Sequence, residues 1–184
     1  MSSAAARGTS AVPRDTGGLG PVIFTGVLLG IGIVGFIDES IFHQLLQWHN
    51  FYWATDQRGR ILSDGLFHVG STLLLLWGAL RLWRDRASWT AAHSRAIVAG
   101  ILIGAGGFNT YDGVVQHVIL HFHLVNEHVC KVANDPNNSI MNCQADIPYE
   151  VVWILVGAII LGSGVVLARR APHEGAVTPR GRGA

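Results

Sequence analysis

Four long apolar stretches alternate with short polar segments along the chain. The first runs over residues 19–37 without a charge, and the others cover about 64–81, 96–128 and 146–170. A helix of about 20 apolar residues is long enough to cross a bilayer. The pattern therefore predicts an all-α fold, an integral membrane four-helix bundle formed by residues 19–170. Residues 1–18 and the basic residues 171–184 are predicted to be disordered tails.

Composition and charge support this class of protein. Charged residues make up 14% of the 184-residue chain, against about a quarter in soluble domains. The net charge is +1 without a long basic run, so nucleic acid is not an expected partner. Ten of the 13 Lys and Arg residues lie in residues 1–18, 81–95 and 169–184. By the positive-inside rule we expect a multi-pass protein of the bacterial inner membrane with both termini in the cytoplasm.

One motif occurs twice, and its two copies are 74 residues apart. It has the form D-x4-H-x5-H, first as Asp38, His43 and His49 and then as Asp112, His117 and His123. Each copy follows a glycine-rich apolar run. We therefore expect two duplicated hairpins, about 19–86 and 96–170, related by an axis along the membrane normal.

The second helix of each hairpin also begins with paired polar residues. Asp64-x3-His68 opens one and Asp146-x3-Glu150 opens the other, and a spacing of four places both members of a pair on one helix face. Asp64 and Asp146 could equally be helix N-caps. In the predicted topology all these side chains lie at the outer end of the bundle.

Imidazoles and carboxylates projecting inward from facing helices are typical of metal sites in bundles. We take His43, His68, His117 and Glu150 as the first candidate ligands. Asp38, Asp64, Asp112, His49, His123 and His121 are further ligands, orienting groups or ligands of a second ion.

Helical geometry limits how these residues can combine. Asp38 and His43 lie about 140° apart on an α-helix, and His43 and His49 cannot bind one ion from an unbroken helix. A kink near residues 43–50, or two separate ions, is therefore expected. His117 and His121 could chelate one ion as an i, i+4 pair. A purely structural polar network is the alternative interpretation of the cluster.

Cys130 and Cys143 lie in the polar loop at residues 129–147. The predicted topology places this loop in an oxidising space, which favours a disulfide over two unrelated thiols. Trp48, Phe51 and Trp53 have the composition of a membrane–water interface belt.

Three motifs resemble those of a known family. They are G-F-x-D-x4-H-x4-W-H from Gly35, D-G-L-F-H from Asp64 and G-F-N-x-Y-D-G-x3-H from Gly107. They are similar to a bacterial family of predicted four-helix membrane proteins catalogued as a domain of unknown function. The resemblance covers about residues 20–168 and implies the four-helix architecture, without an activity or cofactor. Asn50 departs from it, since many relatives are expected to carry His there.

The leading functional hypothesis is a membrane metalloprotein with one or two ions of Fe, Zn or Cu at the outer face. Such a site could serve a di-metal redox enzyme or a hydrolase acting on a lipid-soluble small molecule. The alternatives are a proton or metal-ion transporter, a b-type haem protein and a non-catalytic assembly factor. Besides the bilayer, a homo-oligomer or another membrane protein is the expected partner.

Overall fold

The computed structural model describes residues 18–131 and 143–170, and the regular secondary structure of these residues is all helical. The predicted tails at 1–18 and 171–184 lie almost wholly outside these residues. Four helices are long and apolar enough to span a membrane. They comprise α1 (Gly20–Ile37) with the π-helix η1 (Asp38–Leu45), α2 (Gln57–Asp85), α3 (Ala91–Tyr111) with the π-helix η3 (Asp112–Ile119), and α5 (Ile147–Arg169). Short helices η2 (Arg86–Ser88), α4 (Glu127–Lys131) and η5 (Gln144–Asp146) lie between them.

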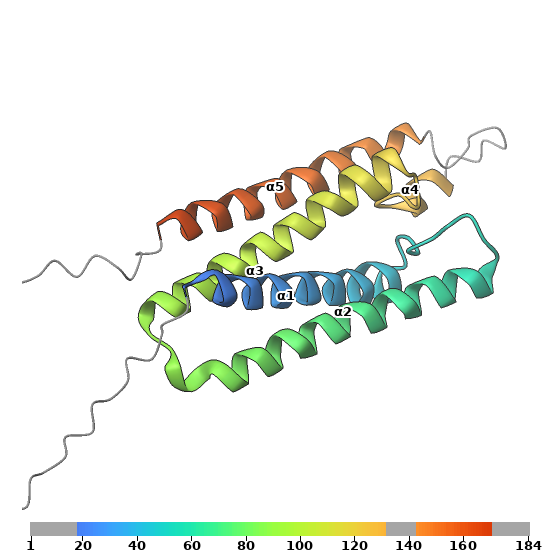
Figure 1. Ribbon diagram of the computed structural model, residues 1–184. Coiled ribbons are helices and arrows are strands. Elements are labelled where there is room, and N and C mark those ends of the chain that lie inside the picture. The colour runs from blue at the N-terminus through green and yellow to red at the C-terminus, as the bar shows by residue number, and fades with distance from the viewer. Residues whose placement is uncertain (1–17, 132–142, 171–184) are drawn as a thin grey trace, which may run out of the picture.

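Helices α1 and α3 form the centre of the bundle. They pack against each other, α2 packs on α1, and α5 packs on α3 (Figure 1). Each long helix runs antiparallel to the next one along the chain, so α1 and α3 run in the same direction. The connections after η1 and η3 therefore lie at one end of the bundle, and the α2–α3 turn lies at the other. The predicted four-helix membrane architecture is thus confirmed.

Glycine allows the two central helices to touch through their backbones. A Cβ added to Gly26 of α1 would lie 2.8 Å from the Cα of Gly100 of α3, and one added to Gly104 would lie 2.9 Å from the Cα of Val27. Gly30 meets the backbone of Ala105 in the same way. These small-xxx-small pairs allow the close helix packing that stabilises membrane helices, where there is no hydrophobic drive between them.

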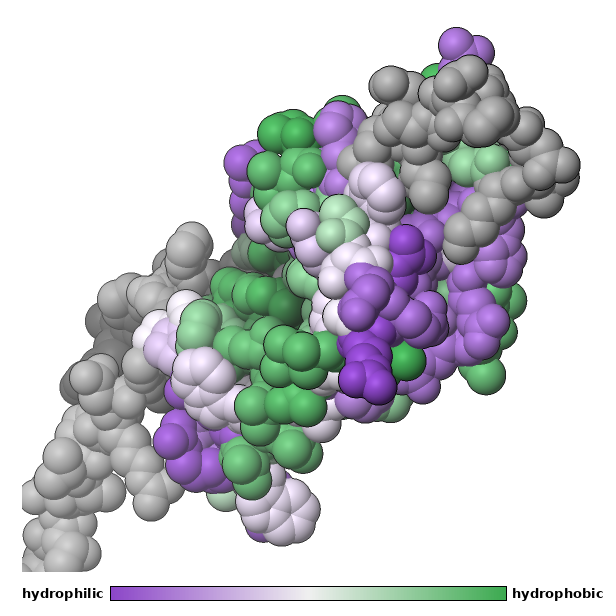
Figure 2. Space-filling model, turned by 90° about the vertical axis from the view of Figure 1, so that its right-hand side faces the viewer, coloured by the Kyte–Doolittle hydropathy of each residue, from purple (hydrophilic) through white to green (hydrophobic). Residues whose placement is uncertain are grey.

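The distribution of side chains is that of a membrane protein. The largest fully buried side chains are mainly polar, among them His117, His123, Glu39 and Asp146, whereas many large apolar side chains are exposed. On α2, for example, Leu66, Leu73 and Leu80 are at least 60% exposed. Seen from the end that carries the connecting loops, hydrophilic side chains gather beside a band of hydrophobic ones (Figure 2).

The second span begins earlier than the sequence pattern suggested. Asp56 is the N-cap of α2 and accepts a hydrogen bond from the Gly59 amide at 2.8 Å, so most of the predicted loop at 54–63 is helical. Asp64 therefore lies inside the helix and is not a cap. The capping interpretation is therefore wrong for Asp64, whereas Asp146 stands at the expected N-cap position of α5 but makes no capping hydrogen bond with its side chain.

The glycine contacts give a first prediction. Gly100→Ala would place a methyl group against the α1 backbone, so we expect a loss of at least about 1–3 kcal/mol of stability, the usual cost of overpacking. Gly70→Ala on α2 is the matched control, since a Cβ there meets nothing within 4 Å. It should be neutral or stabilising by about 0.5–1 kcal/mol, because alanine is the better helix former. Thermal unfolding in detergent measures both, and equal transitions would contradict the backbone contact.

Candidate metal centre

Each central helix changes from α to π geometry where its D-x4-H-x5-H motif begins. The π-helices η1 and η3 start at Asp38 and Asp112 and run for eight residues each. In a π-helix the hydrogen bonds join residues five apart, so the aspartate and the first histidine of each motif come to lie one above the other. This is how two side chains that lie about 140° apart on an α-helix reach the same face.

The helix then ends in a sharp backbone turn. Gln47 and His121 both have φ of 52°, and they are the only non-glycine residues with positive φ in the described chain. The amides of Trp48 and Phe122 donate to the carbonyls of Phe42 and Gln116, each at 2.8 Å. The break falls inside the interval 43–50 where a kink was expected, and the second copy breaks at the corresponding place.

These turns bring the second histidine of each motif back over the first. The ring centroids are 4.5 Å apart for His43 and His49, and 4.4 Å apart for His117 and His123. Together with its aspartate, each pair forms a buried group of three ligand atoms that lie within 4.8 Å of one another. We call Asp38, His43 and His49 the first triad, and Asp112, His117 and His123 the second triad.

The Nε2 atoms face the aspartates in both triads. In the first triad Asp38 lies 3.5 Å from His43 Nε2 and 3.7 Å from His49 Nε2. In the second triad Asp112 lies 3.0 Å from His117 Nε2 and 3.7 Å from His123 Nε2. The two triads are neighbours, because the rings of His49 and His123 stack at 4.7 Å with an interplanar angle of 19°.

Backbone carbonyls of the opposite connection hold the second histidines. His49 Nδ1 lies 2.8 Å from the Val125 carbonyl, and His123 Nδ1 lies 2.9 Å from the Phe51 carbonyl. A carbonyl only accepts, so the proton of each neutral ring is on Nδ1 and a lone pair is on Nε2. Orientation of a ligating histidine through its other nitrogen is the usual arrangement in metal sites.

Carboxylates hold the first histidines. His43 Nδ1 lies 2.9 Å from Glu39 and 3.2 Å from Asp64, whereas His117 Nδ1 lies 3.2 Å from Glu150. Glu39 is fully buried and was missed by the sequence reasoning, although its i, i+4 spacing to His43 could have revealed it. With His43 and Asp64 it forms a third group of potential ligands, which uses the other ring nitrogen of His43.

The closest pair of ring nitrogens lies in the second triad. His117 Nε2 and His123 Nε2 are only 2.8 Å apart, and two lone pairs at that distance repel unless a proton or a metal ion lies between them. Burial, together with the imidazoles of His49 and His117, holds the pKa of His123 well below its usual value. A lowered pKa favours the neutral ring, which is the form in which a histidine can bind a metal ion.

Several atoms of the first triad are joined only by the long contacts to Asp38, at 3.5 and 3.7 Å. His43 Nε2, His49 Nε2 and Asp38 Oδ1 are buried and make no hydrogen bond. Buried polar atoms in native proteins are nearly always paired, and a site for an ion is one recognised reason for an exception. These atoms converge on the same point, which fits the donor set of a transition metal.

Two of the predicted site residues lie apart from the triads. His68 is half-buried on α2, and its ring packs against Phe36 at 5.4 Å. His121 is exposed because η3 ends before it, so the expected i, i+4 pair with His117 on a continuous helix does not form. Asp64 and Glu150 contact His43 and His117 but face their Nδ1 atoms.

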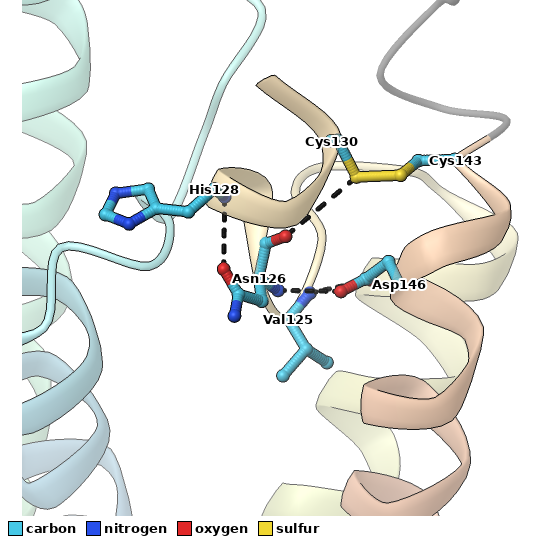
Figure 3. The surroundings of a disulfide bond; sticks show 6 residues. All are labelled: Val125, Asn126, His128, Cys130, Cys143 and Asp146. Carbon is cyan, nitrogen blue, oxygen red and sulfur yellow. Dashed lines mark hydrogen bonds between the residues drawn. A yellow bond between two sulfur atoms is a disulfide. The ribbon is translucent and has the colours of Figure 1, made fainter. Parts of the chain in front are cut away.

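A disulfide closes the connection beyond the second triad. Cys130 and Cys143 are bonded, with their Cα atoms 5.8 Å apart, which agrees with the expected pairing. Beside it, the Asp146 carboxylate accepts hydrogen bonds from the amides of Val125 and Asn126 at 3.1 and 2.8 Å, whereas the ring of His128 points away from Asp146 (Figure 3). The carbonyl that orients His49 is thereby fixed to the start of α5.

Three cavities approach the centre from different sides. Groove A, of about 610 Å³, lies between α1 and α5 and reaches Asp38. Groove B, of about 840 Å³, lies between α1 and α2 and is lined mainly by apolar residues. A third cavity of about 510 Å³ is lined by Glu150, Asp146, His121 and His117, and is the most polar of the three.

Comparison with known proteins places the chain in a family. Residues 25–171 match the predicted membrane protein family DUF2243, a domain of unknown function, and the chain belongs to this family. The resemblance read from the three motifs is thereby confirmed. No curated protein and no solved structure matches the chain.

The disulfide gives a prediction for this end of the molecule. Because it closes a short loop, Cys143→Ser should lower stability by about 3 kcal/mol, and reduction of the wild type should have a similar effect. Maleimide labelling of denatured, unreduced protein should detect no free thiol. Quantitative labelling without reductant would contradict the disulfide.

Proposed function

We propose that this protein is an integral membrane metalloprotein that binds two transition-metal ions, one in each triad. The observation that carries the proposal is the convergence of four imidazole Nε2 atoms and two aspartates whose lone pairs face one another in a buried site. Imidazole with carboxylate suits Fe or Zn better than Cu(I), which prefers sulfur ligands.

Because His49 stacks on His123, the two triads are adjacent, and ions held by them would be close enough to act on one substrate. Paired metals can share a substrate between them, and a redox-active pair could exchange two electrons with it. Fe or Cu would support a redox reaction, and Zn would support hydrolysis by a metal-bound water. Haem is less well supported, because the 2.8 Å between His117 Nε2 and His123 Nε2 leaves no space for a macrocycle.

We further infer that the two hairpins are copies related by a two-fold axis. The Trp53 amide donates to the Phe122 carbonyl, and the Glu127 amide donates to the Trp48 carbonyl, at 3.0 and 2.8 Å. Both the donors and the acceptors are 74 residues apart in the sequence, as are His49 and His123. Reciprocal bonds of this kind are what a duplicated hairpin facing its own copy would make.

The centre is proposed to face the outside of the bacterial inner membrane, with both termini in the cytoplasm. The disulfide supports this orientation, since disulfides persist in oxidising compartments and the bonded cysteines lie at the same end as the triads. The excess of Lys and Arg at the opposite end supports it independently.

Metal content is the direct test. Plasma mass spectrometry on detergent-purified protein should find about two equivalents of one transition metal. His49→Gln and His123→Gln should each lose about one equivalent, and the double variant should lose both, because each removes an Nε2 ligand from one triad. His68→Gln, on α2 and outside both triads, is the matched control and should retain the full content. Full content in the double variant, or no metal bound by reconstituted wild type, would refute the proposal.

The polar cavity suggests how the ions arrive. A hydrated cation is not expected to cross the apolar grooves, whereas this cavity leads past His121 and Glu150 to His117. We expect His121→Asn to slow Zn²⁺ uptake by the metal-free protein several-fold without changing the final content. Asparagine is the replacement of choice because it tolerates the positive φ. His128→Asn, at an exposed histidine outside the cavity lining, should leave the rate unchanged. Equal rates in all three proteins would exclude this route.

A further inference from the structure

Groove A differs from an ordinary lipid-facing groove in what lies on its wall. It runs along α1 and α5 and is lined mainly by apolar side chains, yet Asp38 of the first triad reaches it. Asp38 is 3% exposed, and its Oδ1 atom makes no hydrogen bond. A ligand in this groove would therefore lie against a residue of the proposed metal centre.

The second triad is also connected to groove A. The ring of Trp153 forms part of the wall, and its Nε1–H donates to Asp112 Oδ2 at 3.1 Å. The same indole lies 6.0 Å from the His117 ring, centroid to centroid. One triad thus meets the groove directly and the other meets it through the indole.

The two ends of groove A have different chemistry. Near Asp38 the wall is a cluster of aromatic rings, with Phe42 5.3 Å from Trp48 and 5.1 Å from Trp153, and with Trp48 5.7 Å from Tyr149. Further along α5 the lining changes to the aliphatic side chains of Val156 and Ile160. A flat ring fits the first part and an alkyl chain fits the second.

Groove B provides an internal comparison because it is larger but chemically plainer. No residue of either triad lines it. Phe51, Phe67 and Phe108 stack there with centroid distances of 5.0 and 5.9 Å, and Phe67 lies between the groove and His43. Both grooves therefore offer aromatic rings, but only groove A also offers a carboxylate of a triad, that of Asp38.

We propose that groove A binds a lipid-soluble phenol, with its ring among the aromatic side chains, its hydroxyl directed at Asp38 and its alkyl chain along Val156 and Ile160. The phenol would be the substrate of the proposed metal centre, so this role of the groove rests on the proposed function. The binding itself depends on the groove and can be measured without the metal.

The test is saturation binding of tritiated 4-decylphenol to the full chain in lipid nanodiscs, with empty nanodiscs as the blank. Decylbenzene, which lacks the hydroxyl, is the matched ligand and should bind about ten-fold more weakly or worse, for the loss of one hydrogen bond to a charged group. Val156→Trp fills groove A from an exposed position and should weaken phenol binding by at least about ten-fold. Leu73→Trp, the same change at an exposed position in groove B, should alter it by less than about two-fold.

Three outcomes would overturn the inference: equal binding of phenol and decylbenzene, equal effects of the two tryptophan variants, or no saturable binding. Metal content is measured on the same preparations, so failure of the two proposals can be distinguished. Bound metal without phenol binding removes the substrate class alone. Saturable phenol binding to a protein that never takes up metal removes the metal centre and keeps the groove.

Discussion

The close contact of α1 with α3 is the constraint on which the rest of the structure depends. Four glycines, Gly26, Gly30, Gly100 and Gly104, let the two backbones touch, and a single Cβ at these positions would overlap a neighbouring main chain. Only at this separation can the connection after one helix reach the imidazole carried by the connection after the other. The contacts of His49 with the Val125 carbonyl and of His123 with the Phe51 carbonyl follow from it.

Burial of so many polar side chains at one level has a large free-energy cost. Polar partners at the Nδ1 atoms, which are half of the ring nitrogens, offset part of this cost. Each Nδ1 in the two triads faces a carbonyl or a carboxylate, and these partners fix the direction of the ring. The Nε2 atoms and the aspartate oxygens instead face one another, with the indole of Trp153 as a further donor to Asp112. If the centre holds the proposed ions, its ligands are already oriented, and little conformational entropy would be lost on binding.

The two triads are alike in composition but differ in charge. Asp38, Glu39 and Asp64 all lie within 3.5 Å of His43, whereas the carboxylates that contact His117 are those of Asp112 and Glu150. The position of Glu39 is taken by Gly113 in the second copy of the motif. The first triad is therefore the more negative environment and would hold a cation more strongly than the second, so the two proposed sites are not equivalent. The two grooves also differ in charge, since the Asp38 carboxylate lines groove A and no residue of a triad lines groove B.

The sequence by itself determined the four membrane-spanning helices, because apolar length is decisive in a bilayer. It also picked out Asp38, His43, His49 and their three counterparts, because ionisable residues are costly in membrane helices and recur at a fixed spacing only where they form a site. It indicated a break near residues 43–50 for the simple reason that six residues of α-helix cannot bring two histidines together.

Only the tertiary structure decided which of these residues meet. The π-helical turns place Asp38 and His43 on the same helix face, and no residue pattern in the motif predicts a π-helix. The positive φ of His121 removes that side chain from the cluster, and Asp56 rather than Asp64 begins α2. His68 is matched in sequence with Glu150 but lies outside the triads, where its ring packs on Phe36 of α1, and that contact depends on packing between helices. Spacing along one helix defines a set of candidates, and contacts between helices choose among them.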